Sequence, residues 1–153
     1  MKRILIAVDD SKGSIRAADT LIDMFSTTKP FVTLVNVQKV LGPSLVGEGM
    51  AMGPEMDTLR EALQGTEYQE ALDERANKIM AFYNDKFQKA GITNISSIVK
   101  EGHPAEEILN SAKEVDAELI VLGSRGKRSH DFLLGSVSRE VANGSSIPVL
   151  LTK

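Results

Sequence analysis

The residues best suited to binding an anion lie between positions 123 and 138, in the stretch GSRGKRSHDFLLGSVS. Gly123 and Gly126 would let the backbone approach a ligand closely. Gly135-Ser136 opens a segment of helical spacing, where free N–H groups and the helix dipole attract negative charge. The basic side chains beside these glycines are Arg125, Lys127 and Arg128. Guanidinium and ammonium groups pair with phosphate oxygens, so the stretch predicts a phosphate-binding loop.

Each of these residues also has a structural interpretation. Gly123 could end a strand, Gly126 could form a turn and Ser136 could cap a helix. Taken singly, none of them identifies a site. Their coincidence in one loop, beside the ligand crevice expected from the order of the elements, favours anion binding.

Established phosphate and hydrolase motifs do not match this stretch. Gly-Lys at 126–127 would belong to a P-loop only with glycine at 121 and Ser or Thr at 128, where the chain has Val121 and Arg128. The dinucleotide fingerprint requires glycine in place of Arg125 and follows a first strand, whereas this loop follows the fourth. No acid and histidine follow Ser136 in the order of an α/β-hydrolase triad. All three motifs are therefore excluded.

A second candidate contact follows the first apolar run, ILIAV at 4–8. Asp9 stands where a strand would end, and its carboxylate suits neutral hydroxyl and amino groups better than phosphates. A ribose or base at Asp9, with phosphates at the glycine-rich stretch, would describe one extended nucleotide. For the neighbours Asp10 and Ser11, capping of the following helix is an equally good interpretation.

Five short apolar runs alternate with four segments of helical spacing. The runs are 4–8, 31–37, 95–100, 118–123 and 147–152, and the helical segments are 15–25, 72–90, 103–114 and 135–144. Runs without polar alternation predict strands buried on both faces, with the more polar third run at an edge. Alternation of strands and helices predicts one α/β domain, an open parallel sheet between two helical layers. Its ligands bind at the carboxyl ends of the strands where the winding reverses, beside Asp9 and the glycine-rich stretch.

Composition excludes other classes of protein. The formal net charge of -3 argues against a general nucleic-acid binder. There are no cysteines, and the two histidines, His103 and His130, make a histidine metal site improbable. The first apolar run stops after five residues, short of the roughly 7 that a signal peptide needs, and no stretch approaches a membrane span. We expect a soluble, cytoplasmic protein.

Residues 38–64 form the irregular part of the sequence, rich in glycine, proline and methionine. A loop of more than roughly 15 residues is either a functional lid or a mobile insertion, and we favour the insertion. The methionine-rich part at 48–56 could also form an adaptable partner surface.

The whole chain resembles the universal stress protein family. The similar segments are ILIAVDDS (4–11), GHPAEEIL (102–109), AELIVLGSRG (117–126) and LLGSVSREVANGSSIPVLL (133–151). The resemblance implies a five-stranded parallel sheet in the order 3-2-1-4-5. It also implies a homodimer formed by antiparallel pairing of the last strands, here 147–152. An apolar edge strand agrees with such pairing, because left open it would be an association hazard.

Nucleotide-binding members of this family hold ATP with a Gly-x2-Gly-x9-Gly-(Ser/Thr) loop. The resemblance therefore implies ATP, or ADP or AMP, as the ligand, with Mg²⁺ reaching the site only through the phosphates. By position, Val8 and Val37 would hold adenine through backbone groups and Asp9 would contact ribose or adenine. The residues implied around ribose and phosphates are Gly123, Gly126, Gly135, Ser136 and Val137, with Arg125 as an added cation.

The chain departs from the family's loop at one point. Eight residues, KRSHDFLL, separate Gly126 from Gly135, where the ATP-binding pattern has nine. One residue spans up to roughly 3.5 Å, so the loop tip must take another path. Because every glycine and the Gly135-Ser136 pair are intact, the polar tip can absorb the deletion.

Three functions remain open at this point. The leading one is a regulatory, ATP-binding dimer of the stress response. The second is a universal stress protein dimer that binds no nucleotide and acts through protein contacts. The third is a slow ATPase or adenylyl-transfer enzyme. No residue is an obvious general base for a γ-phosphate, so we predict no catalytic residue and at most weak hydrolysis.

Overall fold

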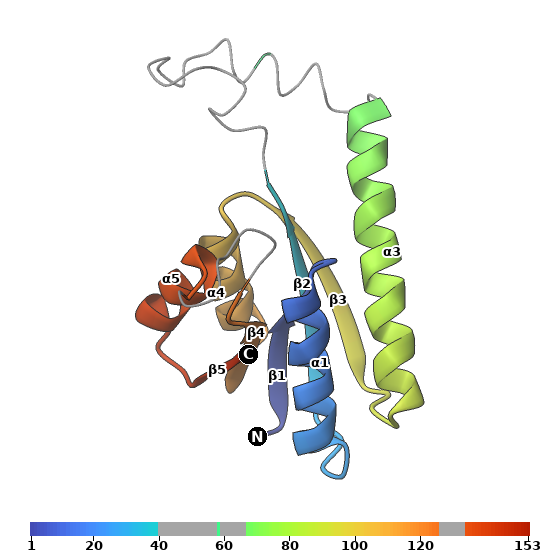
Figure 1. The fold of residues 1–153 in the computed structure, drawn as a ribbon, viewed down its shortest axis with the longest axis vertical. Coiled ribbons are helices and arrows are strands. Elements are labelled where there is room, and N and C mark those ends of the chain that lie inside the picture. The colour runs from blue at the N-terminus through green and yellow to red at the C-terminus, as the bar shows by residue number, and fades with distance from the viewer. Residues whose placement is uncertain (40–57, 59–66, 126–133) are drawn as a thin grey trace.

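The computed structural model describes residues 1–39, 58, 67–125 and 134–153 (Figure 1). Most of the irregular segment expected at 38–64 lies outside the described residues, as do the methionine-rich part 48–56 and Gly126. Gln38 itself belongs to the second strand, so that strand runs one residue further than the sequence predicted.

Five parallel strands form one sheet. The strands are β1 (Arg3–Ala7), β2 (Phe31–Gln38), β3 (Ile95–Glu101), β4 (Leu119–Gly123) and β5 (Val149–Thr152). The described helices are α1 (Lys12–Phe25), α3 (Glu67–Lys89), α4 (Pro104–Glu114) and α5 (Ser136–Gly144). The strand order is β3-β2-β1-β4-β5, and every neighbouring pair is parallel. The predicted α/β fold class and the order 3-2-1-4-5 are confirmed.

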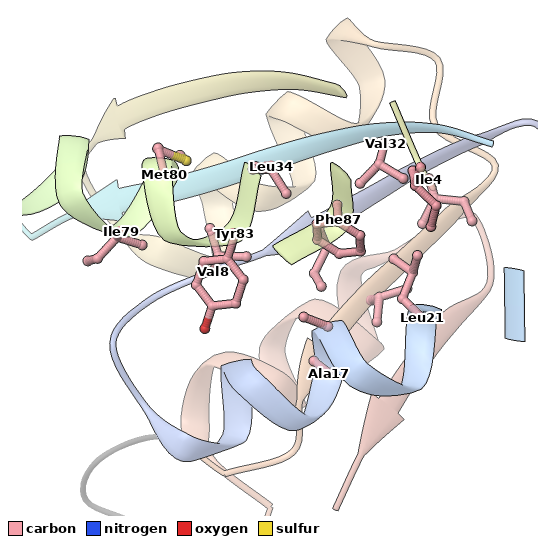
Figure 2. Packing of buried hydrophobic residues seen from close by; sticks show 14 of the residues in the cluster. Ile4, Val8, Ala17, Leu21, Val32, Leu34, Ile79, Met80, Tyr83 and Phe87 are labelled. Atoms are coloured by element: carbon pink, nitrogen blue, oxygen red, sulfur yellow. The ribbon is translucent and has the colours of Figure 1, made fainter. Parts of the chain in front are cut away.

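Successive side chains of the inner strands enter two different cores. Ile4 and Ile6 of β1 join a cluster with residues of α1 and α3, part of which Figure 2 shows. Leu5, between them, joins a second cluster with residues of α4 and α5. Helices thus cover both faces of the sheet and make a three-layer α/β/α sandwich (Figure 1). Burial on both faces explains why these strands read as continuous apolar runs.

The two edge strands differ in character. In β3 exposed and half-buried residues alternate, as the more polar sequence predicted for an edge. At the opposite edge β5 begins at Val149, two residues later than expected. Its start is set by the two residues before it, because Ile147 donates its N–H to Ser145 Oγ and Pro148 has no N–H to donate. No helix among the described residues is both long and apolar enough to cross a membrane.

Candidate functional site

The loop that follows β1 is ordered by its own side chains. Ser11 caps α1, with its Oγ accepting a hydrogen bond from the Ser14 N–H at 3.2 Å. Asp9 Oδ1 accepts from the Ser11 N–H at 2.8 Å, which closes a tight turn. Of the two cap candidates left open by the sequence, Ser11 is the cap, and Asp9 is held half-buried at the carboxyl end of β1.

The backbone of Asp9 is fixed from two other elements. Its N–H donates to Ser14 Oγ of α1 at 3.0 Å, and its carbonyl oxygen accepts from the Tyr83 hydroxyl of α3 at 2.9 Å. The Tyr83 oxygen also lies 2.8 Å from Ser14 Oγ. The sequence placed Tyr83 only within the segment of helical spacing at 72–90. The available signal was its hydroxyl, since a buried tyrosine usually needs a hydrogen-bond partner.

Two further contacts fasten α3 to this edge of the sheet. Arg75 forms an ion pair with Asp10, with 2.5 Å between Nη2 and Oδ2. Gln38, which ends β2 and is buried, donates from Nε2 to the Leu72 carbonyl at 3.0 Å. These two contacts hold α3 beside the loop after β1.

The two valines predicted to contact adenine lie at the same end of the sheet. The N–H of Val8 donates to the Val35 carbonyl at 2.8 Å, and its carbonyl accepts from Asn36 Nδ2 at 2.8 Å. The carbonyl oxygen retains a second lone pair for another donor. Val37 is half-buried in β2, against the cluster on the α4–α5 face.

The second loop leaves the sheet after β4 and returns at α5. The Gly135 N–H donates to the Ser124 carbonyl at 2.8 Å. The buried Ser138 hydroxyl donates to the Gly123 carbonyl, also at 2.8 Å. Both ends of the loop are therefore tied at its base. Gly126, the remaining predicted glycine, lies outside the described residues.

The start of α5 offers donors beside this base. Ser136 is exposed at the first helical position, and the half-buried Val137 follows it. The N–H groups of a first helical turn have no acceptor within their own helix. Ser136 could therefore bind an anion through both its N–H and its hydroxyl. The half-buried Arg125 adds a positive charge on the β4 side of the loop.

The first turn of α1 touches the end of β4 and the start of the second loop through glycine backbone. A Cβ built on Gly123 would lie 2.6 Å from the Gly13 carbonyl carbon, and one built on Gly13 would overlap the Arg125 carbonyl oxygen. The space left by the missing Gly123 side chain is thus filled by the first turn of α1, whereas the sequence predicted close approach of a ligand there. Gly13, which the sequence analysis did not single out, joins the two loops into one surface.

Burial is the largest influence on the ionisation of Tyr83, the tyrosine beside the Asp9 turn. Burial raises the pKa of Tyr83 to about 12, and the negative charges of Asp9, Asp10 and Asp19 add to the rise. The Tyr83 hydroxyl is therefore neutral at physiological pH and can act as a donor. Within the described ranges, no group of three or more His, Asp or Glu side chains is arranged to hold a metal ion.

Comparisons with known proteins point to one family. The sequence model of the universal stress protein family matches residues 1–153. Universal stress protein YxiE of Bacillus subtilis is 31% identical over 99% of this chain and 98% of its own length. The solved structure of the Methanocaldococcus jannaschii protein MJ0577 is similar with a TM-score of 0.79 at 26% identity, covering 99% of this chain and 95% of that one.

A further solved structure extends the likeness in fold. It is a universal stress protein in complex with cAMP, with a TM-score of 0.69 at 24% identity, and it covers 99% of this chain and 97% of its own. At this level of identity the likeness concerns the fold alone.

Proposed function

The chain belongs to the universal stress protein family, and on that basis we propose that it binds an adenine nucleotide, ATP foremost, in the crevice between β1 and β4. One observation carries the proposal. The Asp9 turn and the base of the second loop meet through Gly13 and Gly123, at the point where the sheet reverses its winding. Open α/β sheets bind their ligands at this point.

The donors and acceptors along this surface fit such a ligand. The Asp9 carboxylate would accept hydrogen bonds from ribose hydroxyls or the adenine amino group. At the other end, Ser136 and the N–H groups of the first turn of α5 would bind phosphate oxygens, with Arg125 supplying charge. Backbone groups of Val8 and Val37 would border the base. The fold is compatible with this role, since a structure of the same fold contains cAMP.

The remaining predicted contacts complete the phosphate side. Gly135 and Val137 flank Ser136 at the start of α5, whereas the side-chain position of Gly123 is already occupied by the backbone of Gly13. Mg²⁺ would enter with the phosphates, which supply most of its oxygen ligands along with water. The protein then acts by binding rather than by chemistry, as a regulatory module whose nucleotide state changes its contacts.

The proposed assembly is a homodimer through the strand at 147–152. β5 lies at an edge of the sheet, and its residues Val149, Leu150 and Leu151 are all only half-buried in the single chain. Apolar side chains on an unpaired edge favour pairing with a second copy. Pairing there would leave the opposite edge strand, β3, free.

Isothermal titration calorimetry of the purified protein with ATP, ADP and AMP tests the proposed ligand. We expect all three to bind, and Asp9→Ala to weaken binding of each because they share the nucleoside end. Asp23→Ala, an exposed aspartate near the far end of α1, is the matched control and should bind like the wild type. Absence of binding by all three nucleotides at millimolar concentration would exclude the proposal and leave a role through protein contacts.

A further inference from the structure

A tyrosine of α3 is hydrogen-bonded to the turn that carries Asp9. Tyr83 belongs to the C-terminal half of a 23-residue helix and lies 74 positions from Asp9 in the sequence. Its hydroxyl meets the Asp9 carbonyl at 2.9 Å and Ser14 Oγ at 2.8 Å, and Ser14 Oγ in turn accepts from the Asp9 N–H. Both backbone polar groups of Asp9 therefore belong to one three-residue network.

The ring of Tyr83 cannot move freely. The residue is 1% exposed and packs in the cluster between the sheet, α1 and α3 (Figure 2). Phe82 meets it edge to face, with 5.1 Å between the ring centroids. Close packing restrains a side chain to one rotamer, so the hydroxyl is held in one place.

Packing in the apolar core does not by itself require the hydroxyl of Tyr83. A phenylalanine ring would fill nearly the same volume. One turn further along α3, Phe87 packs in the same cluster without a hydroxyl. The oxygen lies at the margin of the cluster, next to the loop after β1, where its partners are (Figure 2). The high pKa of Tyr83 keeps it protonated, so that it donates to the Asp9 carbonyl at any physiological pH.

We propose that Tyr83 is a positioning residue for nucleotide binding, which fixes the backbone of Asp9 so that its carboxylate is preset for the nucleoside. The inference rests on the proposed nucleotide function. With the Asp9 N–H bound by Ser14, its carbonyl by Tyr83 and Oδ1 by the Ser11 N–H, the turn has little freedom left. Prior ordering of a contact group lowers the entropic cost of binding.

The position of the network predicts which part of the ligand is affected. Tyr83 acts through Asp9, at the nucleoside end, and makes no contact with the base of the phosphate loop. Its removal should therefore weaken ATP, AMP and adenosine by the same factor. A general loosening of the fold would instead affect the loop after β4 as well and would reduce ATP binding more than adenosine binding.

The test is the Tyr83→Phe variant, which keeps the ring and removes only the hydroxyl. We expect its dissociation constants for ATP, AMP and adenosine to rise by about 5- to 10-fold, the net worth of one hydrogen bond. Ser96→Ala is the matched control. It deletes a hydroxyl that contacts Thr33 Oγ1 at 3.0 Å, near the amino ends of β2 and β3. It should leave nucleotide affinity unchanged.

A second variant separates positioning from packing. Ser14→Ala removes the acceptor of the Asp9 N–H and the second neighbour of Tyr83. If the three residues act as one network, the double variant Tyr83→Phe with Ser14→Ala should lose less affinity than the product of the two single losses. Independent, fully multiplicative losses would contradict the network.

Two results distinguish the inference from the function on which it rests. If wild type binds ATP and Tyr83→Phe binds it equally well, the positioning role is wrong and the proposed function stands. If wild type binds no nucleotide, both are wrong. A loss in Tyr83→Phe confined to ATP, with adenosine unaffected, would also overturn the positioning role.

Discussion

At the scale of single residues, the ordering of Asp9 is what supports the proposed contact with a nucleoside. Its N–H, its carbonyl and one carboxylate oxygen each have a defined partner, from Ser14, Tyr83 and Ser11 respectively. Those partners come from two helices and from the loop itself. The turn is thus ordered by the packed core, and a ligand would not have to order it.

The ionisation of Tyr83 gives a prediction for alkaline stability. The unfolded tyrosine ionises near pH 10 and the folded one near pH 12, because burial opposes the phenolate. Between these values the unfolded state loses a proton that the folded state keeps, so the free energy of unfolding must fall as pH rises. We expect this fall to reach about 2 kcal/mol by pH 12, relative to Tyr83→Phe.

Urea unfolding of wild type and Tyr83→Phe at pH 9 and at pH 12 measures this difference. All other ionisable groups are the same in the two proteins, so their effects cancel in the comparison. A difference in unfolding free energy that stays constant over this range would show that Tyr83 is not shielded from solvent.

Sequence could identify some of these residues and not others. Asp9 and Ser136 could be predicted as candidates because each stands next to the element that positions it, a strand end and a helix start. Tyr83 and Gly13 were missed, since what defines them is a contact with a residue far away in the chain. Gly126 is the predicted contact that lies outside the described residues.

At the scale of elements, the site depends on how closely α1 approaches β4. Gly13 in the first turn of α1 faces Gly123, and neither leaves room for a side chain. The two loops can share one surface only at this separation. The ties from Ser138 and Gly135 to the end of β4 then place α5 at the same surface.

Gly13→Ala tests this contact. The new methyl group would collide with the backbone oxygen of Arg125, which no rotamer change can relieve. We expect a loss of about 1–3 kcal/mol in the free energy of unfolding. We also expect weaker ATP binding, because the loop after β4 must move.

Gly144→Ala is its control, since that methyl group would meet only Leu109 Cδ1, the end of a flexible side chain, at 2.9 Å. Denaturant unfolding and calorimetry of both variants give the comparison. Equal stability and equal ATP affinity of Gly13→Ala and wild type would refute the close packing of the two loops.

The sequence predicted the order of the helices and strands more accurately than the residues at which they begin and end. Uninterrupted apolar runs identified the buried strands, and the polar run at 95–100 identified an edge. The limits were less exact at β2, which continues through Gln38, and at β5, which Pro148 delays. Gln38 is added to β2 by its pairing with Glu101 of β3, whereas β5 is shortened by local hydrogen bonding at Ile147 and by the missing N–H of Pro148, and periodicity reports neither.

At the scale of the whole molecule, the proposed dimer predicts that the two edges of the sheet behave differently. If β5 pairs with a second copy, light scattering should give the mass of two chains at micromolar concentration. Dilution should then accelerate amide hydrogen exchange in β5. β3, the other edge strand, serves as the internal control and should not respond to dilution. A single-chain mass at tens of micromolar would contradict the pairing.

An NMR titration of the ¹⁵N-labelled protein with ATP tests the proposed ligand and its place on the molecule together. The account predicts saturable amide shifts for residues on the two loops, led by Asp9, Gly13, Gly123 and Ser136. Amides lining the shallow hollow between α4 and α5, such as that of Asn143, should remain in place. A spectrum unchanged at millimolar ATP, or shifts confined to that hollow, would contradict the account.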